Sequence, residues 1–460
     1  MAETTIEQIT KAQEKLTAQS RSYAINEAYV KGKNPDILGK EPGKEPDNRI
    51  PIPLAKMAVE DLTGYAARPG DTTIRYESDS DKDNEAEKKK EDEYNLIIKS
   101  WMESNNDELE LSEQYQKTLT HGNSFELFWT SESSEVSGIP IQPEWKRVDG
   151  NQIYIEYDNS LKPNKIAAYH IREIDEDTIC DIYYPLYSEH WIKTKDTEWK
   201  HEEENDTEYP YTVVPVIEFV GNIDKDPLFE AEKRIIDSLD NIISKSLNEV
   251  DRFNAVIALF PGEITKETAD KLKTMRVLDK LDGFDRWPEY LEKNLAGSNE
   301  FYNLLSDRLE RLFHKSVKIP DMTDENFAGN QSGVAIAYKL IGMEFKASMI
   351  EIYFFQGIKE RKILFDDILN TGSTKKLDTD QYKTVIESQR NLPVDEATKV
   401  QIAMMLKGLV TDETLLRFLP QSIIKDAEKE LAKLEEQQKA NPLIQIEDEN
   451  DKPSEANNDE

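Results

Sequence analysis

Three carboxylates lie close together in the second half of the chain, at Asp321, Asp324 and Glu325. Carboxylates are the usual protein ligands of divalent cations such as Ca²⁺ and Mg²⁺. Their spacing does not follow the calcium-loop pattern, which needs oxygen ligands at alternate positions and a fixed glutamate. We therefore expect these side chains to cap a helix and solvate a loop, with no metal site.

The remaining residues with chemical potential do not form a catalytic motif. No histidine falls in an HExxH pattern and no serine in GxSxG. Neither a GxxxxGK[ST] loop nor a GxGxxG turn occurs, so nucleotide binding of the P-loop or dinucleotide type is not expected. The sequence predicts no catalytic residue, no cofactor and no enzymatic activity. One alternative stays open, a metal-dependent enzyme that uses the Asp/Glu cluster.

The acidic cluster belongs to a polar segment between two long helical patterns. The first pattern ends at Ile319–Pro320, and the second starts at Val334. Between them Gly329 and Gly333 give the backbone freedom that other residues lack. A polar loop between two helices is a poor core element and a good contact element.

Charge and composition restrict the possible partners. The 460 residues carry a formal net charge of −34, with 33% charged and 37% hydrophobic residues. This acidity argues against binding DNA through phosphate neutralisation, and it suits a protein that must not stick to a nucleic acid passing close by. The one cysteine, Cys180, is expected to be a small buried apolar residue. Without a long apolar run or a signal-peptide pattern, we expect a cytoplasmic site of synthesis and no membrane contact.

Hydrophobic periodicity predicts an α+β fold. Helices are expected at 4–30, with Ala24–Ile25 among the apolar positions, at 54–65, and at 94–119 with a break near Asn105–Asn106. Residues 77–93 are expected to be a solvated loop, and short antiparallel strands to follow, at 124–130, 153–157, 165–171, 178–187 and 190–194. Later elements are a helix from Asp226, a small α/β insert at 261–297, a returning helix at 298–314, a helix at 334–369 and a strand at 384–387.

Two features of the helical region point to contacts beyond one chain. The two helices that flank the insert carry more apolar positions than one helical hairpin requires, which favours packing between subunits. Trp287 in the insert fits either a small core or an interface. In the helix at 334–369, Gly342 and Gly357 are expected to mark bends or close packing.

The segment from Asp321 to Ala335, followed by Tyr338-Lys339-Leu340, resembles the tunnel loop and following helix of the portal proteins of Bacillus-type siphophages. Residues 48–65 resemble the N-terminal wing segment of that family. The order of helix, insert and helix over 226–316 is similar to its stem and clip. Asn391-Leu392-Pro393, with the helical patterns after it, resembles the entry to its C-terminal crown.

The resemblance implies a portal-type fold and a ring of about a dozen subunits around a channel at one capsid vertex. The implied divisions are a wing at 1–225, a stem helix at 226–254, a clip at 255–297, a second stem helix at 298–318, a tunnel loop at 319–333, a long helix and return to the wing at 334–390, a crown at 391–440 and a disordered acidic tail at 441–460.

It also implies roles for individual residues. Gly329 and Gly333 become loop hinges. Phe327 either anchors the folded loop, which we favour, or touches the duplex. The loop residues expected to face DNA are Asp321, Thr323, Asp324, Glu325, Asn326, Phe327, Asn330 and Gln331. The clip residues expected to dock partners are Lys266, Lys271, Lys273, Arg276, Asp285, Arg286 and Trp287.

The implied partners are copies of the same chain, double-stranded DNA passing without sequence specificity, the terminase large subunit, a head-completion or connector protein, and the scaffolding and major capsid proteins. The implied location is the virion, after assembly in the host cytoplasm. The main alternative is an acidic scaffold or adaptor protein of particle assembly that forms no channel.

Overall fold

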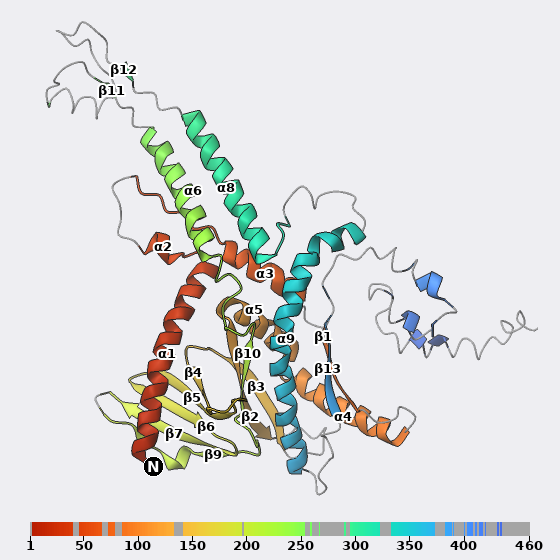
Figure 1. Cartoon of the computed structure of the whole chain (residues 1–460). Coiled ribbons are helices and arrows are strands. Elements are labelled where there is room, and N and C mark those ends of the chain that lie inside the picture. The colour runs from red at the N-terminus through yellow and green to blue at the C-terminus, as the bar shows by residue number, and fades with distance from the viewer. Residues whose placement is uncertain are drawn as a thin grey trace, which may run out of the picture. The chain divides into compact units, whose positions relative to one another are not determined.

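The computed structural model describes most of the first 372 residues and a few later pieces (Figure 1). The chain divides into two units, one formed by residues 1–322 and 340–391 and the other by 323–339 and 392–460. The described ranges are 2–39, 46–66, 72–78, 85–132, 141–195, 197–253, 258–259, 266, 289–290, 295–322, 333–372, 382–388 and 390, with short pieces between 400 and 434.

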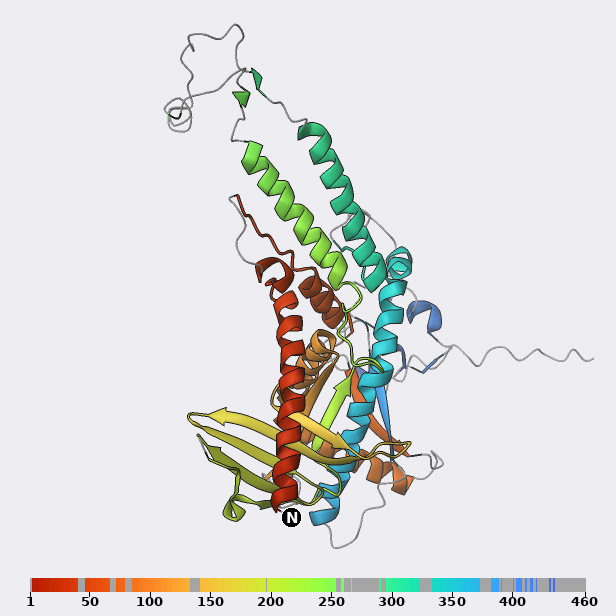
Figure 2. The ribbon, with the colours of Figure 1, turned by 60° about the vertical axis from the view of Figure 1, so that its left-hand side comes forward.

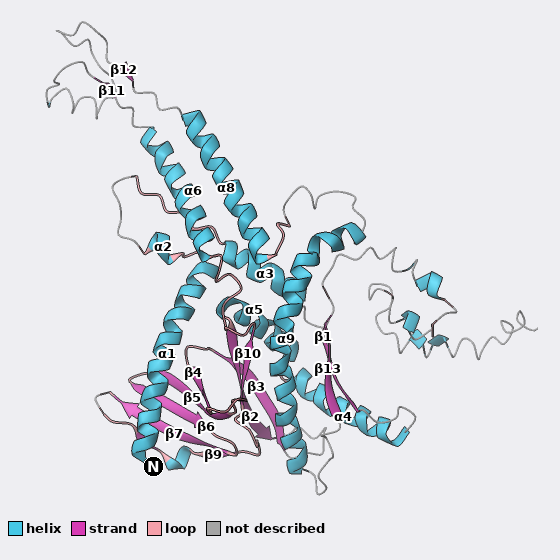
Figure 3. Cartoon of the chain, viewed as in Figure 1, coloured by secondary structure: helices cyan, strands magenta, loops and turns pink. Residues whose placement is uncertain are grey.

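The first unit mixes helices with antiparallel sheets, as the α+β prediction requires (Figure 3). Its helices are α1 (Ala2–Val30), α2 (Pro35–Leu38), α3 (Leu54–Ala66), α4 (Glu85–Ser104), α5 (Asp107–His121), α6 (Lys233–Phe253), α8 (Leu295–Val317) and α9 (Gly333–Gly372), the last of which begins in the second unit. Its strands are β1 (Thr72–Ser78), β2 (Asn123–Glu132), β3 (Ile141–Val148), β4 (Ile153–Tyr157), β5 (Lys165–Ile174), β6 (Asp177–Tyr183), β7 (Tyr187–Thr194), β8 (Lys200–His201), β9 (Thr207–Glu208), β10 (Val216–Val220), β11 (Ala258–Leu259), β12 (Glu289–Tyr290) and β13 (Tyr382–Ser388).

The largest sheet has six strands, in the order β4-β5-β6-β7-β8 with β9 also paired to β7. Strand alternation sends Ala167 and Tyr169 to one face, where they join Ile9 and Ala12 of α1 in one core cluster. Ala168, between them, belongs to a different cluster with residues of β2, β4 and β10. The sheet is therefore covered by α1 on one face and by the three-stranded sheet β10-β2-β3 on the other.

Helix α9 buries one face along most of its length. Gly357 lets it approach β10, because a Cβ there would lie only 2.5 Å from the Phe219 ring. This confirms the expectation of close packing at that glycine. Buried residues recur every three or four positions along α9, as in an amphipathic helix, at Leu340, Met343, Ala347, Ile350, Phe354, Ile358, Arg361, Phe365 and Ile368.

Helices α6 and α8 run side by side in both ribbon views (Figures 1 and 2). They are antiparallel, and Ser316 near the end of α8 donates a 2.6 Å hydrogen bond to Glu232, just before α6. Ile236, Leu239 and Phe313 are buried at this end of the pair.

Several expected boundaries are wrong. Residues 85–93 belong to α4 and not to a loop, and β3 was missed altogether. Ala24 and Ile25 are exposed, whereas Asn26 and Tyr29 are buried in α1. The helix expected from Asp226 begins only at Lys233. The Leu228 amide donates to the Leu119 carbonyl of α5, and the residues between Leu228 and Lys233 form turns.

Other expectations hold. The break between α4 and α5 lies at Asn105–Asn106, with Asn106 in the left-handed region at φ 51°. Cys180 is a buried free thiol. No helix in the described ranges has the length and apolar character needed to span a bilayer.

Candidate functional site

Most of the expected DNA-facing loop lies outside the described residues. Asp321 is described and partly exposed, and Gly333 is the first residue of α9. Of the expected clip residues, Lys266 is described and exposed. Outside the described ranges are Thr323, Asp324, Glu325, Asn326, Phe327, Gly329, Asn330, Gln331, Lys271, Lys273, Arg276, Asp285, Arg286 and Trp287, and the tail at 441–460.

The side of the loop that follows α8 has a defined turn. Helix α8 ends at Val317, and Lys318 takes a left-handed backbone at φ 65°, which reverses the chain. Ile319 then buries its side chain, and its carbonyl accepts a 2.9 Å hydrogen bond from Nδ1 of His314. Pro320 has no amide hydrogen and cannot continue the helix.

This turn carries Asp321 back towards α8. Ligand atoms of Glu310, His314 and Asp321 all lie within 4.8 Å of one another. The sequence pattern groups Asp321 with Asp324 and Glu325 and assigns no histidine to a motif. The signal that could have found the group is the four-residue spacing of Glu310 and His314, which places both on one face of a helix.

Helix α6 is joined to an extended segment at residues 48–53. The amides of Asn48, Ile50 and Ile52 donate to side chains of α6, namely to Asn248 at 2.6 Å, Ser244 at 3.0 Å and Asp240 at 2.8 Å. Two residues of extended chain advance roughly 6.6 Å, and four residues of helix advance about 6.0 Å. Every second amide of the segment can therefore reach every fourth side chain of α6.

Proline fits between these bonds. Pro51 and Pro53 have no amide hydrogen to satisfy, so they fill two of the alternate positions without loss of a hydrogen bond. Asp240 is fully buried and also accepts a 2.7 Å hydrogen bond from the side-chain Nδ2 of Asn34. The segment 48–53 is therefore packed on α6 as a fixed part of the fold.

Helices α8 and α9 also carry exposed apolar side chains. Along α9 they form a stripe of four residues at spacings of four, four and three, which we call the α9 stripe. Phe301 and Leu304 of α8 are also exposed, by 59% and 68%. The α9 stripe consists of Ile341, Phe345, Met349 and Ile352, exposed by 47%, 58%, 58% and 64%.

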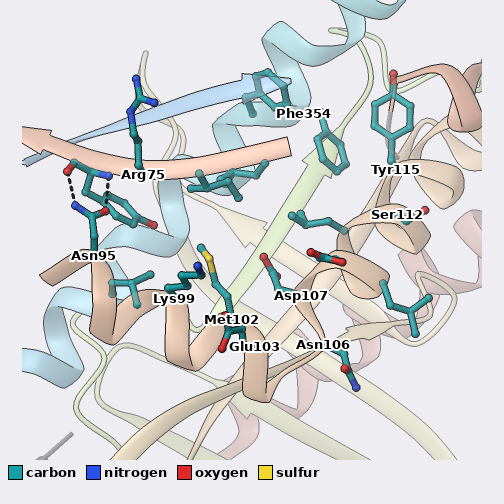
Figure 4. Close-up of a pocket in the computed structure, with 18 of the residues that line it drawn as sticks. Arg75, Asn95, Lys99, Met102, Glu103, Asn106, Asp107, Ser112, Tyr115 and Phe354 are labelled. Atoms are coloured by element: carbon teal, nitrogen blue, oxygen red, sulfur yellow. Dashed lines mark hydrogen bonds between the residues drawn. The ribbon is translucent and has the colours of Figure 1, made fainter. Parts of the chain in front are cut away.

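A cavity of about 1060 Å³ lies among β1, α4, α5 and α9 (Figure 4). Asn95 lies on its wall and clamps β1, since its side chain accepts from the Tyr76 amide and donates to the Tyr76 carbonyl, both at 2.8 Å. Tyr115 and Phe354 form part of its apolar wall.

A buried ion cluster lies next to this cavity. Arg361 of α9 is fully buried, donates to both oxygens of Glu126 at 2.8 and 2.5 Å, and donates to Asp107 at 2.7 Å. Asp107 also accepts a hydrogen bond from the Trp145 indole at 3.1 Å. The cluster joins α5, the three-stranded sheet and α9, so its evident role is structural.

Comparison with known proteins identifies the class. The family model described as "Phage portal protein, SPP1 Gp6-like" matches residues 9–442, nearly the whole chain. The chain therefore belongs to this family of phage portal proteins, which confirms the resemblance found in the sequence.

Two curated relatives carry the name portal protein. The one from Clostridium phage phiCD119 is 24% identical over 220 residues, which cover 46% of each chain. The one from Bacillus phage SPP1 is 23% identical over 228 residues, which cover 49% of this chain and 44% of the relative. The chain thus matches a little under half the length of each relative.

Proposed function

We propose that this chain is the portal subunit of a tailed phage or prophage particle. About a dozen copies form a closed ring around a channel at one capsid vertex, through which double-stranded DNA enters and leaves. The observation that carries the proposal is the family match over residues 9–442. The role is structural and not enzymatic, and any ATP-driven work belongs to the packaging motor.

Exposed apolar surface supports assembly. Exposed apolar stripes rimmed by polar residues mark protein contacts more often than chance allows. The α9 stripe and the exposed residues of α8 face away from the cores of their own chain. A head-to-tail ring buries such a face against a different face of the next copy.

Segment roles follow from the family order. Helices α6 and α8 form the stem, and the residues between them form the clip that docks the terminase large subunit and later a head-completion protein. The wing and crown contact scaffolding and major capsid proteins. The segment after Pro320, starting with Asp321, faces DNA. Assembly takes place in the host cytoplasm, and the final location is the virion.

Charge supports passage of DNA without retention. At −34 per chain, a ring of about a dozen copies has a strong negative field, which disfavours tight phosphate binding. Polar uncharged side chains such as Asn326, Asn330 and Gln331 can make weak, exchangeable contacts with a moving duplex.

The test is the mass and shape of the purified chain, by mass photometry and negative-stain imaging. Rings with a central hole and a mass of about twelve times 53.0 kDa support the proposal. A chain that stays monomeric at high concentration and with scaffolding protein present contradicts it. That result favours the acidic adaptor without a channel. A metal-dependent activity lost on Asp321 substitution would instead favour an enzyme.

A further inference from the structure

The end of α8 brings an imidazole and two carboxylates together. Glu310 and His314 are one helical turn apart on α8, and Asp321 reaches the same place after the turn at Lys318. Their ligand atoms, one from each side chain, lie within 4.8 Å of one another. Both Glu310 and Asp321 reach solvent, so an ion has an entry path.

The hydrogen bonding of His314 leaves one nitrogen available. Its Nδ1 lies 2.9 Å from the Ile319 carbonyl oxygen, which can only accept, so the proton is on Nδ1. In the neutral imidazole Nε2 then has a lone pair, and that atom is buried without a hydrogen-bond partner in the described structure. Metal-binding histidines usually have this arrangement, with the second ring nitrogen donating to a carbonyl or a carboxylate.

The surroundings favour a cation. The carboxyl end of a helix carries a partial negative charge, and α8 ends beside the cluster. Asp61 of α3 is a further carboxylate within electrostatic range of both His314 and Asp321. Carboxylates at a helix carboxyl end add to its negative potential, which attracts cations.

We propose that Glu310, His314 and Asp321 bind one divalent transition-metal ion. The donor set of one imidazole nitrogen and two carboxylate oxygens suits Zn²⁺ and its first-row neighbours, whereas Ca²⁺ and Mg²⁺ prefer oxygen ligands alone. Water completes the coordination. The ion ties Asp321 to α8 and so fixes the point where the following segment leaves the stem; its relevance to a DNA channel rests on the proposed function.

The experiment is calorimetric titration of the full-length protein with ZnCl₂, after treatment with EDTA and its removal. Two variants remove ligands, Glu310→Gln and His314→Gln. Glu310 is exposed, so Glu310→Gln keeps the fold, which circular dichroism checks. Two matched controls change residues of the same types elsewhere, Glu300→Gln on the exposed surface of α8 and His201→Gln beside Asp206.

We expect one Zn²⁺ per chain, with Kd raised at least about tenfold in both ligand variants and unchanged in both controls. Co²⁺ bound to the same site should give a visible absorption band that His314→Gln removes. Absence of saturable binding, or equal affinity in all the variants, overturns the proposal. The titration measures Zn²⁺ bound per chain, whether or not the chains form rings. Mass photometry tests ring formation separately, so failure of the metal proposal and failure of the portal proposal can be told apart.

Discussion

Arg361 shows how a single buried charge can hold three elements together. Its guanidinium has no exposed surface and satisfies Glu126 and Asp107 at once. Removing one partner of a buried ion pair leaves the other charges uncompensated, which costs far more than the pair itself contributes.

We therefore predict that Arg361→Met lowers the free energy of unfolding by about 3–5 kcal/mol, measured by urea denaturation. Lys359→Met, an exposed substitution of similar shape on the same helix, should change it by less than about 0.5 kcal/mol. Equal losses in the two variants would mean that Glu126 and Asp107 find other partners.

Buried histidines give the protein a pH dependence. Burial lowers the pKa of His170 to about 4 and that of His121 likewise to about 4. Unfolded histidines titrate near about 6.5. Between these values the unfolded chain binds more protons than the folded chain, so stability falls as the pH falls.

We predict that the free energy of unfolding decreases from about pH 7 to about pH 5, by up to about 1.4 kcal/mol per pH unit for each histidine. Neither ring nitrogen of His170 has a hydrogen-bond partner in the described structure, so His170→Phe should fold. That variant should show a shallower slope in urea denaturation series. An unchanged slope would show that His170 binds protons equally in the folded and unfolded chains.

At the scale of elements, the pairing of residues 48–53 with α6 is the feature that periodicity could not predict. The prolines identified an extended segment, but nothing in the sequence specified that alternate amides would meet every fourth residue of a helix 200 positions away. Side chains such as Asp240 and Asn248 also fit the polar face of an amphipathic helix, so their residue types do not identify these contacts.

We predict that Asp240→Ala destabilises the protein by about 1–3 kcal/mol, because it leaves the Ile52 amide without an acceptor and removes one of the two hydrogen bonds that the Asn34 side chain donates to α6. Hydrogen exchange should accelerate at Ile50 and Ile52. Lys245→Ala, exposed on the same helix, is the control and should leave exchange unchanged. Protection that survives in Asp240→Ala would show that the segment is held by other contacts.

A second prediction at this scale concerns the start of α9. If residues 321–333 face DNA, Gly333→Val should leave ring formation intact and strongly reduce DNA packaging, because a β-branched residue restricts the backbone at the hinge. DNase-protected DNA per particle measures this. Ala335→Val, on the same helix, is the matched control. Normal packaging by Gly333→Val would count against the loop assignment.

The sequence predicted most elements and few of the contacts between them. Strong patterns such as those of α1, α3, α9 and the strands β4 to β7 predicted the right type of element, because each has a clear period. The strand expected at 178–187 is nevertheless too long, since β6 ends at Tyr183 and Tyr187 begins β7. Strand β3 was missed because Pro143 interrupts its pattern. Arg361 was missed because it lies in the run Lys359-Glu360-Arg361-Lys362, which resembles a solvated face.

For the candidate site, the sequence predicted closely where α8 ends and where α9 begins, and it missed the group formed by Glu310, His314 and Asp321. Glu310 and His314 are on one helix, but Asp321 joins them only through the left-handed turn at Lys318. A non-glycine residue in that conformation is uncommon and is not signalled by residue type.

At the scale of the whole molecule, the α9 stripe bears on assembly. Each apolar side chain of this size gains about 1.5–3 kcal/mol when it is fully buried. A carboxylate in its place would have to be desolvated at the interface.

We predict that Phe345→Glu weakens each contact between copies at least about tenfold, and that rings disappear from mass photometry while the fold by circular dichroism persists. The control Gln356→Glu introduces glutamate at another exposed position of α9 and should still give rings. Rings of normal mass from Phe345→Glu would place the interface elsewhere.

The pairing of β1 with β13 has a consequence during synthesis. Thr72 lies opposite Ser388, so β1 leaves the ribosome with its partner still more than 300 residues away in the chain. At about 5–20 residues per second, that strand waits roughly 15–60 s for its partner. An unpaired strand edge invites pairing with other chains, and charged residues discourage it. Arg75 and Glu77 lie within β1, and Asn95 of the next helix already occupies the Tyr76 amide and carbonyl. The nascent chain thus carries its own temporary protection against aggregation until the last strand arrives.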